Sequence, residues 1–187
     1  MKLIKSVVNI IHDTLDFIVK PGDIAVDATA GNGYDTVKLA ELVGEFGHVY
    51  AFDIQSIAID HTAERLAEAG FSQRVSLLCL DHCFMDTVVK ERVSAVVFNL
   101  GYLPGGNHEI VTESQQTIVA LEKSFAILKP GGVILIGVYW GHPGGEIEKI
   151  AIEDWVSGLP TADCDTMVTS FPNRQKAPMV ITLQKKK

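Results

Sequence analysis

An asparagine stands where an apolar run ends, in the stretch FNLGYLPGG at residues 98–106. Its amide oxygen, together with a nearby backbone carbonyl, can hold the N–H bonds of an amine so that the nitrogen lone pair points at an electrophile. Tyr102, three residues further on, offers a ring that can stack on a flat base. Asn99 is therefore a candidate catalytic residue. The alternatives are a strand-end cap for Asn99 and a packing role for Tyr102.

A glycine turn precedes this asparagine in the chain, within DATAGNGYDT at residues 27–36. The turn follows an apolar run and opens a helical pattern, which is where a nucleotide-type cofactor binds in a doubly wound sheet, and Gly31 and Gly33 let the backbone approach it closely. A dinucleotide fingerprint needs a third glycine where Thr36 stands, and Asp27 would repel a pyrophosphate. Because a carboxylate favours a cationic ammonium group, the pattern favours S-adenosylmethionine as the cofactor. A turn or helix-cap role is the alternative for Asp27.

Two more acidic residues follow apolar runs further along the chain. Asp53 comes 20 residues after Gly33, the separation at which an acid binds ribose hydroxyls in either kind of cofactor. Asp81 is a good acceptor for the hydrogen bond of an adenine amino group. His82 beside it is either a second contact or a partly exposed loop residue.

The elements that would position these residues alternate along the chain. Apolar runs typical of buried strands lie at 24–26, 49–52, 75–80, 95–98 and 133–138, and helical patterns lie at 4–18, 36–43, 57–69, 117–128 and 147–155. Strands that are apolar on both faces, separated by helices, predict a parallel sheet covered on both sides. Two further strand-like segments, 167–170 and 179–183, have no helical pattern between them and predict an antiparallel hairpin.

This order of elements predicts an α/β domain over residues 1–187 with the Rossmann-like class I methyltransferase fold. That fold has a seven-stranded, mostly parallel sheet with an antiparallel C-terminal hairpin and helices on both faces. A dinucleotide-binding Rossmann domain differs because it keeps its sixth strand parallel. We find no repeat or low-complexity linker that would divide the chain.

Composition excludes several classes of protein. A chain of 187 residues with 47% hydrophobic content suits one globular domain with a sizeable core. No apolar run approaches the ~18–20 residues of a membrane span, and the first turns of the chain are unlike a secretory signal, so we expect a cytoplasmic protein with no membrane partner. Three cysteines without a CxxC pair predict neither disulfides nor a metal site. The net charge of −7 requires any RNA partner to use a local basic patch, for which Arg174 and Lys176 are candidates.

Three motifs, DATAGNGYDT, NLGYLPGG and YWGHPGGE, together resemble a bacterial family labelled rRNA methylases, over nearly the whole chain. NLGY also keeps the spacing of the Asn-Pro-Pro-Tyr motif of methyltransferases that modify exocyclic amines, with Leu-Gly replacing Pro-Pro. The family includes a tRNA methyltransferase for 5-aminomethyluridine derivatives. The resemblance implies an S-adenosylmethionine-dependent enzyme that binds the anticodon stem-loop of tRNA. It would methylate the amine of 5-aminomethyl-(2-thio)uridine at wobble position 34, giving 5-methylaminomethyl-(2-thio)uridine.

Carried onto this chain, the resemblance implies cofactor, catalytic and RNA-binding residues. The cofactor side comprises Asp27, Gly31, Asn32, Gly33, Asp53, Gln55, Asp81 and His82, with Asn99 and Leu100 at the transfer site. The catalytic side comprises Asn99, Tyr102, Tyr139 and His142, and RNA contacts are expected from Asn173, Arg174 and Lys176.

The proton of the substrate amine needs an acceptor. An alkylamine is largely protonated at neutral pH and has no lone pair until it loses a proton, so a base or desolvation must help. We expect His142 or Tyr139, after the fifth strand, to assist in this step. The equal alternative is that His142 fixes the geometry of the loop before Pro143.

Other functions stay open at this point. A methyltransferase for another exocyclic amine, in rRNA or DNA, would use the same chemistry. A nicotinamide-dependent oxidoreductase shares the glycine turn and Asp53, but Asp27, Thr36 and the hairpin disfavour it. A non-catalytic RNA-binding module is hard to reconcile with a complete cofactor edge. No sequence feature decides the oligomeric state, although a homodimer would extend the surface offered to RNA.

Overall fold

The computed structural model of the chain describes residues 4–101, 112 and 114–187. The predicted site residue Tyr102 lies outside the described residues. The others all lie within them.

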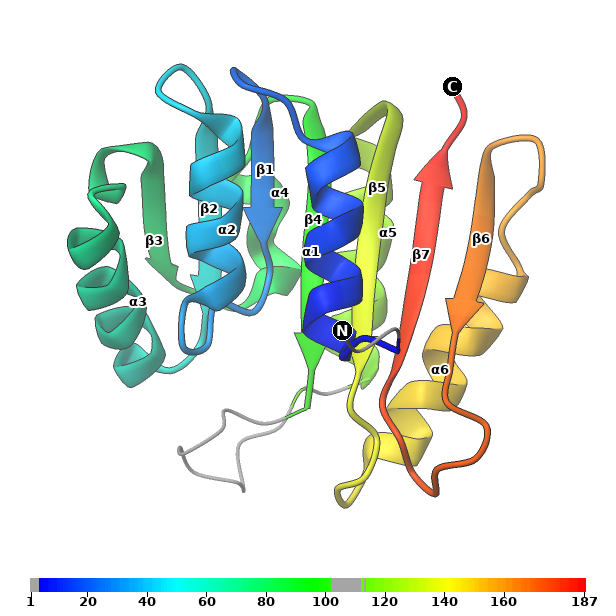
Figure 1. Cartoon of the computed structure of the whole chain (residues 1–187). Helices are drawn as coiled ribbons and strands as arrows, with labels where there is room; N and C mark the ends of the chain where they lie inside the picture. Colours follow the sequence, from blue (N-terminus) through cyan, green and yellow to red (C-terminus); the bar gives the residue numbers. More distant parts are fainter. Residues whose placement is uncertain (1–3, 102–111, 113) are drawn as a thin grey trace.

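Seven strands form one sheet in the order β3-β2-β1-β4-β5-β7-β6 (Figure 1). The strands are β1 (Ile24–Asp27), β2 (His48–Asp53), β3 (Val75–Cys79), β4 (Val93–Leu100), β5 (Leu128–Val138), β6 (Cys164–Thr169) and β7 (Met179–Lys185). The first five pair in parallel, whereas β7 is antiparallel to both β5 and β6. The prediction of a mostly parallel sheet with an antiparallel C-terminal hairpin is confirmed.

Helices cover both faces of the sheet. They are α1 (Val7–Ile18), α2 (Tyr34–Val43), α3 (Ser56–Ala69), α4 (Met85–Val88), α5 (Ser114–Ile127) and α6 (Gly145–Ser157), with short 3-10 turns at Ser72–Arg74 and His82–Phe84. Figure 1 shows α1, α2 and α3 in front of the strands and α4 and α5 behind them. The core is accordingly divided into two apolar clusters, one under α1, α2 and α3 and the other under α4, α5 and α6.

Helix α1 shows how the sequence sets this packing. Ser6 caps its start, since the Ser6 hydroxyl accepts a hydrogen bond from the backbone N–H of Asn9. Val7, Ile11 and Leu15 recur every four residues and are buried against the sheet. The opposite side of α1 is polar except at its end. The helix therefore lies along the sheet and brings its own polar residues close to α2.

The element boundaries differ from the sequence expectation mainly around β5. The strand begins at Leu128, five residues before the predicted run, and follows α5 directly. Its first residues include Lys129, Pro130 and two glycines, a composition typical of a turn. Leu128 nevertheless pairs with Val93 of β4, and the register between the two strands shifts after this pair. Pairing with the neighbouring strand thus overrides the local turn composition.

The buried strands confine polar chemistry to one edge of the sheet. Strand β4 is buried along nearly its whole length, as expected for a central parallel strand with helices on both sides. The polar residues Asp27, Asp53 and Asn99 come at or next to the carboxyl ends of β1, β2 and β4. The antiparallel β7 starts at this same edge, because Met179 pairs with Val138, the last residue of β5. The β6–β7 loop is therefore brought to the edge where the predicted site residues gather.

Candidate active site

A cavity of about 840 Å³ opens at the carboxyl edge of the sheet. The loops after all five parallel strands and the loop between β6 and β7 contribute to its lining. Most predicted site residues line it, namely Gly31, Asn32, Asp53, Gln55, Asp81, His82, Asn99, Leu100, Tyr139, His142 and Lys176. Asp27, Gly33, Asn173 and Arg174 are not among the described residues of the lining.

The glycine turn forms one wall of the cavity and is held by α3. Gly33 has a φ of 80°, and a Cβ at this position would lie 3.0 Å from the Cα of Thr62, so the turn needs glycine there. The Thr62 hydroxyl donates to the carbonyl of Gly31, and Arg65 Nε donates to the carbonyl of Asn32 at 2.8 Å. These contacts fix a wall of backbone that a ligand can approach closely.

Asp53 is oriented by backbone donors on both of its oxygens. Oδ2 accepts from the N–H of Gly31 and Oδ1 from the N–H of Gln55, each at 2.9 Å. A carboxylate oxygen has a second lone pair, so Asp53 can still accept hydrogen bonds from a diol in the cavity. This arrangement fits the ribose of a nucleoside cofactor.

Asp81 and His82 offer hydrogen-bond acceptors after β3. Asp81 Oδ1 accepts from the N–H of Cys83, which sets the orientation of the carboxylate. His82 Nδ1 lies 3.0 Å from the carbonyl oxygen of Ala28, so it carries the proton and leaves Nε2 of the neutral ring as an acceptor. This Nε2 is buried and has no hydrogen-bond partner within the described residues. Two acceptors beside each other fit the amino group of an adenine.

Asp27 lies beneath the turn rather than in the cavity. Its side chain is fully buried, with Oδ1 accepting from the N–H of Thr29 and Oδ2 from the hydroxyl of Thr36 at 2.6 Å. Burial, followed by the negative charge of Asp35, raises the pKa of Asp27 to about 7. Thr36, which breaks the dinucleotide fingerprint, is thus a direct partner of this acid. The described contacts are those of a turn-supporting residue, and a cofactor contact by Asp27 stays a prediction.

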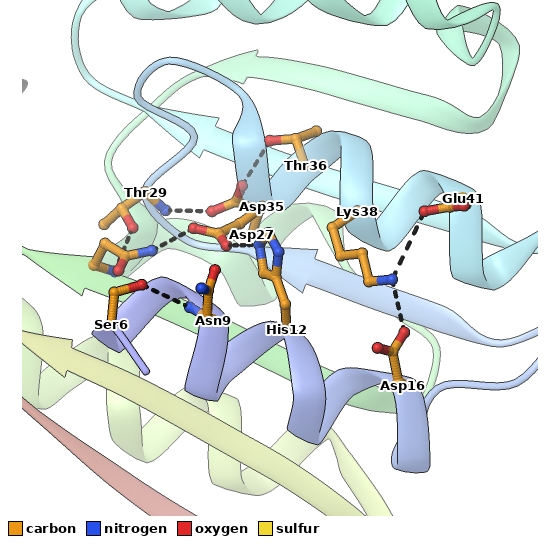
Figure 2. Close-up of polar contacts among 11 residues, drawn as sticks. Ser6, Asn9, His12, Asp16, Asp27, Thr29, Asp35, Thr36, Lys38 and Glu41 are labelled. Atoms are coloured by element: carbon orange, nitrogen blue, oxygen red, sulfur yellow. Dashed lines mark hydrogen bonds and ion pairs between the residues drawn. The ribbon is translucent and has the colours of Figure 1, made fainter. Parts of the chain in front are cut away.

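Asp35 and His12 were not singled out by the sequence, and the structure joins them to Asn99. Asp35 Oδ1 lies 2.6 Å from His12 Nε2, and Asp35 Oδ2 accepts a hydrogen bond of 2.5 Å from Asn99 Nδ2. Figure 2 shows the His12 and Asp35 side chains pointing toward one another between α1 and α2. Asp35 lines the cavity. Asp35 stands in the motif DATAGNGYDT, but nothing in the sequence indicates that it contacts His12 and Asn99.

Two hydrogen bonds fix Asn99. Its backbone N–H donates to the Thr29 hydroxyl at 2.7 Å, and its side-chain nitrogen donates to Asp35. Its Oδ1 is buried without a partner within the described residues, over Gly137, where a Cβ would come within 2.7 Å of that oxygen. In this state the oxygen that was expected to hold an amine faces Gly137, so that role would require the side chain to rotate.

Tyr139 and His142 follow β5 on the other side of the cavity. Burial, followed by the negative charge of Asp35, raises the pKa of Tyr139 above its usual value of 10, so its hydroxyl keeps its proton at neutral pH and can donate a hydrogen bond. His142 Nδ1 lies 3.0 Å from the carbonyl oxygen of Pro143, a contact that suits fixing of the loop. The proton-acceptor role of His142 stays a prediction.

Lys176 is the predicted RNA-binding residue that lines the cavity. Trp140 Nε1 donates to the carbonyl of Ala177 at 2.9 Å, which holds the β6–β7 loop against the loop after β5. The Arg174 guanidinium stacks on the Phe171 ring, and Asn173 lines a separate groove. The hairpin thus brings one cation to the cavity and leaves Arg174 on the loop outside it.

Glu148 of α6 is a further polar residue that the sequence did not indicate. It is buried, and its two carboxylate oxygens accept hydrogen bonds of 2.7 Å from the hydroxyls of Thr112 and Thr117. Thr112 in turn pairs with Gly101 through two hydrogen bonds. Glu148 therefore ties Thr112 and α5 to α6, beside the cavity.

The described part of the chain offers no group of three or more His, Cys, Asp or Glu residues that could hold a metal ion. Within the same residues, no helix is long and apolar enough to cross a membrane. The expectation of a site without a metal stays a prediction.

The sheet order, the glycine turn and the ribose and adenine acceptors define the class of this protein. It is a class I, S-adenosylmethionine-dependent methyltransferase, with the residues of its cavity suited to that cofactor. Comparison with known proteins identifies its family. The chain belongs to the family described as "Putative rRNA methylase", whose sequence profile matches residues 49–185.

Relatives and solved structures agree with this placement. The chain is 41% identical over 192 residues to a chloroplastic tRNA (mnm(5)s(2)U34)-methyltransferase of Arabidopsis thaliana, covering 97% of this chain and 70% of that relative. An rRNA methylase structure from Streptococcus thermophilus is 31% identical with a TM-score of 0.84, covering 100% of both chains. A Streptococcus mutans protein described as a methyltransferase is 34% identical with a TM-score of 0.89, covering 98% of this chain and 99% of that one, and was solved with S-adenosylhomocysteine bound.

Proposed function

We propose that the protein methylates the amine of 5-aminomethyl-(2-thio)uridine at wobble position 34 of tRNA, using S-adenosylmethionine. The product is 5-methylaminomethyl-(2-thio)uridine. The observation that carries this proposal is the 41% identity, over 97% of the chain, to the Arabidopsis thaliana tRNA methyltransferase named for that nucleoside. The placement of Asn99 at the end of β4, in the cavity, supports an amine as the group that accepts the methyl.

Different residues would bind the cofactor and the substrate, on two sides of the cavity. S-adenosylmethionine supplies an electrophilic methyl group when it is bound. Asp53 would accept the ribose hydroxyls, and Asp81 with His82 would accept the adenine amino hydrogens, as their free acceptor positions allow. Asn99, after rotation of its side chain, and Tyr139 would position the substrate amine on the opposite side, which reduces the entropy lost on reaction.

The β6–β7 loop would contribute contacts to the substrate RNA. Lys176 at the cavity and Arg174 outside it are suited to phosphate contacts near the anticodon stem-loop. With a net charge of −7, the protein would make few such contacts, so we expect modest affinity and a shallow dependence of binding on salt. We also propose that a homodimer extends this surface. The proposed location of the protein is the cytoplasm.

Nucleoside mass spectrometry of total tRNA tests the proposal. A strain that lacks the gene should lose 5-methylaminomethyl-type uridines and accumulate the 5-aminomethyl precursor, and the wild-type gene should restore the product. A variant with Asn99→Ala should fail to restore it although the protein is present. An unchanged level of the methylaminomethyl nucleoside in the deletion strain would overturn the tRNA assignment.

Methylation of an amine in rRNA is the second candidate. It rests on partial similarity to a ribosomal RNA small subunit methyltransferase H of Agathobacter rectalis, 36% identical over 83 residues that make up 43% of this chain and 24% of that protein. The same deletion strain separates the two, because a missing methyl group would then appear in digests of rRNA and the tRNA would be unchanged.

A further inference from the structure

A carboxylate–imidazole pair connects the cavity to the surface between α1 and α2. Asp35 lines the cavity with a side chain that is 10% exposed, and His12, 2.6 Å away, has a side chain that is 25% exposed. On the cavity side, Asn99 holds the second oxygen of Asp35. The pair therefore spans the distance between the expected transfer site at the end of β4 and solvent.

Asp35 differs from the other acids near the cavity in what surrounds it. Asp53 and Asp81 accept hydrogen bonds from backbone N–H groups and lie at the ends of β2 and β3, on the side suited to ribose and adenine. Asp27 is fully buried and is not among the described lining residues. Asp35 instead bonds to the Asn99 side chain, so it is the acid of the cavity that lies beside the residue expected to hold the amine.

A primary amine needs such a group, because it enters as an ammonium ion. An ammonium beside a sulfonium cation in a partly desolvated cavity is destabilised, and its proton must go to an acceptor. We propose that Asp35 binds the substrate ammonium and accepts its proton, and that His12 holds the Asp35 carboxylate in place for this step. The inference rests on the proposed function, because only an amine substrate has this proton to lose.

The proton transfer balances without a further reactant. An N–H bond of the ammonium breaks, an O–H bond forms on Asp35, and the electron pair stays on nitrogen as the lone pair that attacks the methyl carbon. His12 Nε2 donates a hydrogen bond to Asp35 Oδ1 and orients the carboxylate, and Asp35 releases the proton to water when the product leaves the cavity. Asp35 is then a carboxylate again, so it is ready for the next turnover.

The groups that face Asp35 come from four parts of the fold. His12 lies on α1, Asp27 on β1, Asn99 on β4 and Tyr139 after β5, and the negative charge of Asp35 acts on Asp27 and Tyr139. One turn along the same two helices, Lys38 of α2 bonds Asp16 of α1 at 2.6 Å (Figure 2). This second α1–α2 contact is not among the described residues of the cavity, so it provides a matched control for helix docking.

The test compares Asp35→Asn and His12→Ala with the control Asp16→Asn. Single-turnover methylation of tRNA that carries 5-aminomethyl-2-thiouridine is measured from pH 6 to 9 under saturating substrates. Asp35→Asn should be slower by about 10²- to 10⁴-fold at neutral pH, and its rate should keep rising with pH because bulk base must remove the proton. His12→Ala should be slowed less than Asp35→Asn, because the carboxylate is still present but is no longer held in place, and Asp16→Asn should behave as the wild type.

Binding measurements separate the two ammonium groups that Asp35 could hold. Titration with S-adenosylhomocysteine, which has an α-ammonium, and with 5′-methylthioadenosine, which lacks it, should give wild-type affinities for both in Asp35→Asn. Loss of affinity for S-adenosylhomocysteine alone would assign Asp35 to the cofactor and overturn the inference. A wild-type pH profile in both Asp35→Asn and His12→Ala would overturn it as well, while leaving the proposed function intact. A wild-type protein that does not methylate this tRNA would overturn both.

Discussion

The buried carboxyl group of Asp27 makes stability depend on pH in a direction that its surroundings determine. Burial raises its pKa from 3.8 to about 7, with a further contribution from the charge of Asp35. The folded protein therefore keeps a proton that the unfolded chain loses above about pH 4. The favourable contribution of this group is fully present below pH 4 and is lost as the pH rises through 7. A shift of about three pKa units corresponds to about 4 kcal/mol at most.

Replacement of Asp27 by Asn removes this titration but keeps a similar shape. The Asn oxygen can still accept from the N–H of Thr29, and its nitrogen can donate to the Thr36 hydroxyl. We expect Asp27→Asn to gain stability relative to the wild type as the pH rises from 4 to 7, with a slope of up to about 1.4 kcal/mol per pH unit. Urea unfolding of both proteins across this range measures the difference. A difference that does not change with pH would refute the argument that Asp27 is folded in its protonated form.

Three further predictions concern the transfer site. Asn99→Ala should keep the affinity for S-adenosylhomocysteine in calorimetry while losing methyl transfer; if transfer survives, Asn99 is only a structural residue. Gly137→Ala would place a methyl group 2.7 Å from Asn99 Oδ1, so it should lower the free energy of unfolding by about 1–3 kcal/mol and slow transfer, and wild-type values for both would show that the site is not this tightly packed. His142→Ala should lower turnover equally at all pH values because the loop loses its contact to Pro143, whereas loss of one limb of the pH–rate profile would make His142 the proton acceptor.

Much of the fold followed from hydrophobic pattern alone. The central strands are apolar on both faces, and the absence of a helical pattern between β6 and β7 was enough to predict the hairpin. The short α4 and the early start of β5 were missed, because Met85–Val88 is too short to show a period and Lys129 opens a turn-like stretch.

The position of a candidate site residue in the fold could be predicted where a single strand end or turn defines it. The glycine turn, Asp53 and Asn99 belong to this group, since local composition marks each of them. The contacts of Asp35 with His12 and of Glu148 with Thr112 depend on helices that meet only in the folded chain. Sequence spacing carries no signal for such pairs, so they could be found only from the structure.

The most direct test of the account uses purified protein, S-adenosylmethionine and tRNA that carries 5-aminomethyl-2-thiouridine at position 34. The nucleosides of the treated tRNA are separated and identified by mass spectrometry. The account predicts conversion of that nucleoside to 5-methylaminomethyl-2-thiouridine by the wild type and none by Asn99→Ala. An unchanged wobble nucleoside, with a wild-type protein that still binds S-adenosylhomocysteine, would contradict it.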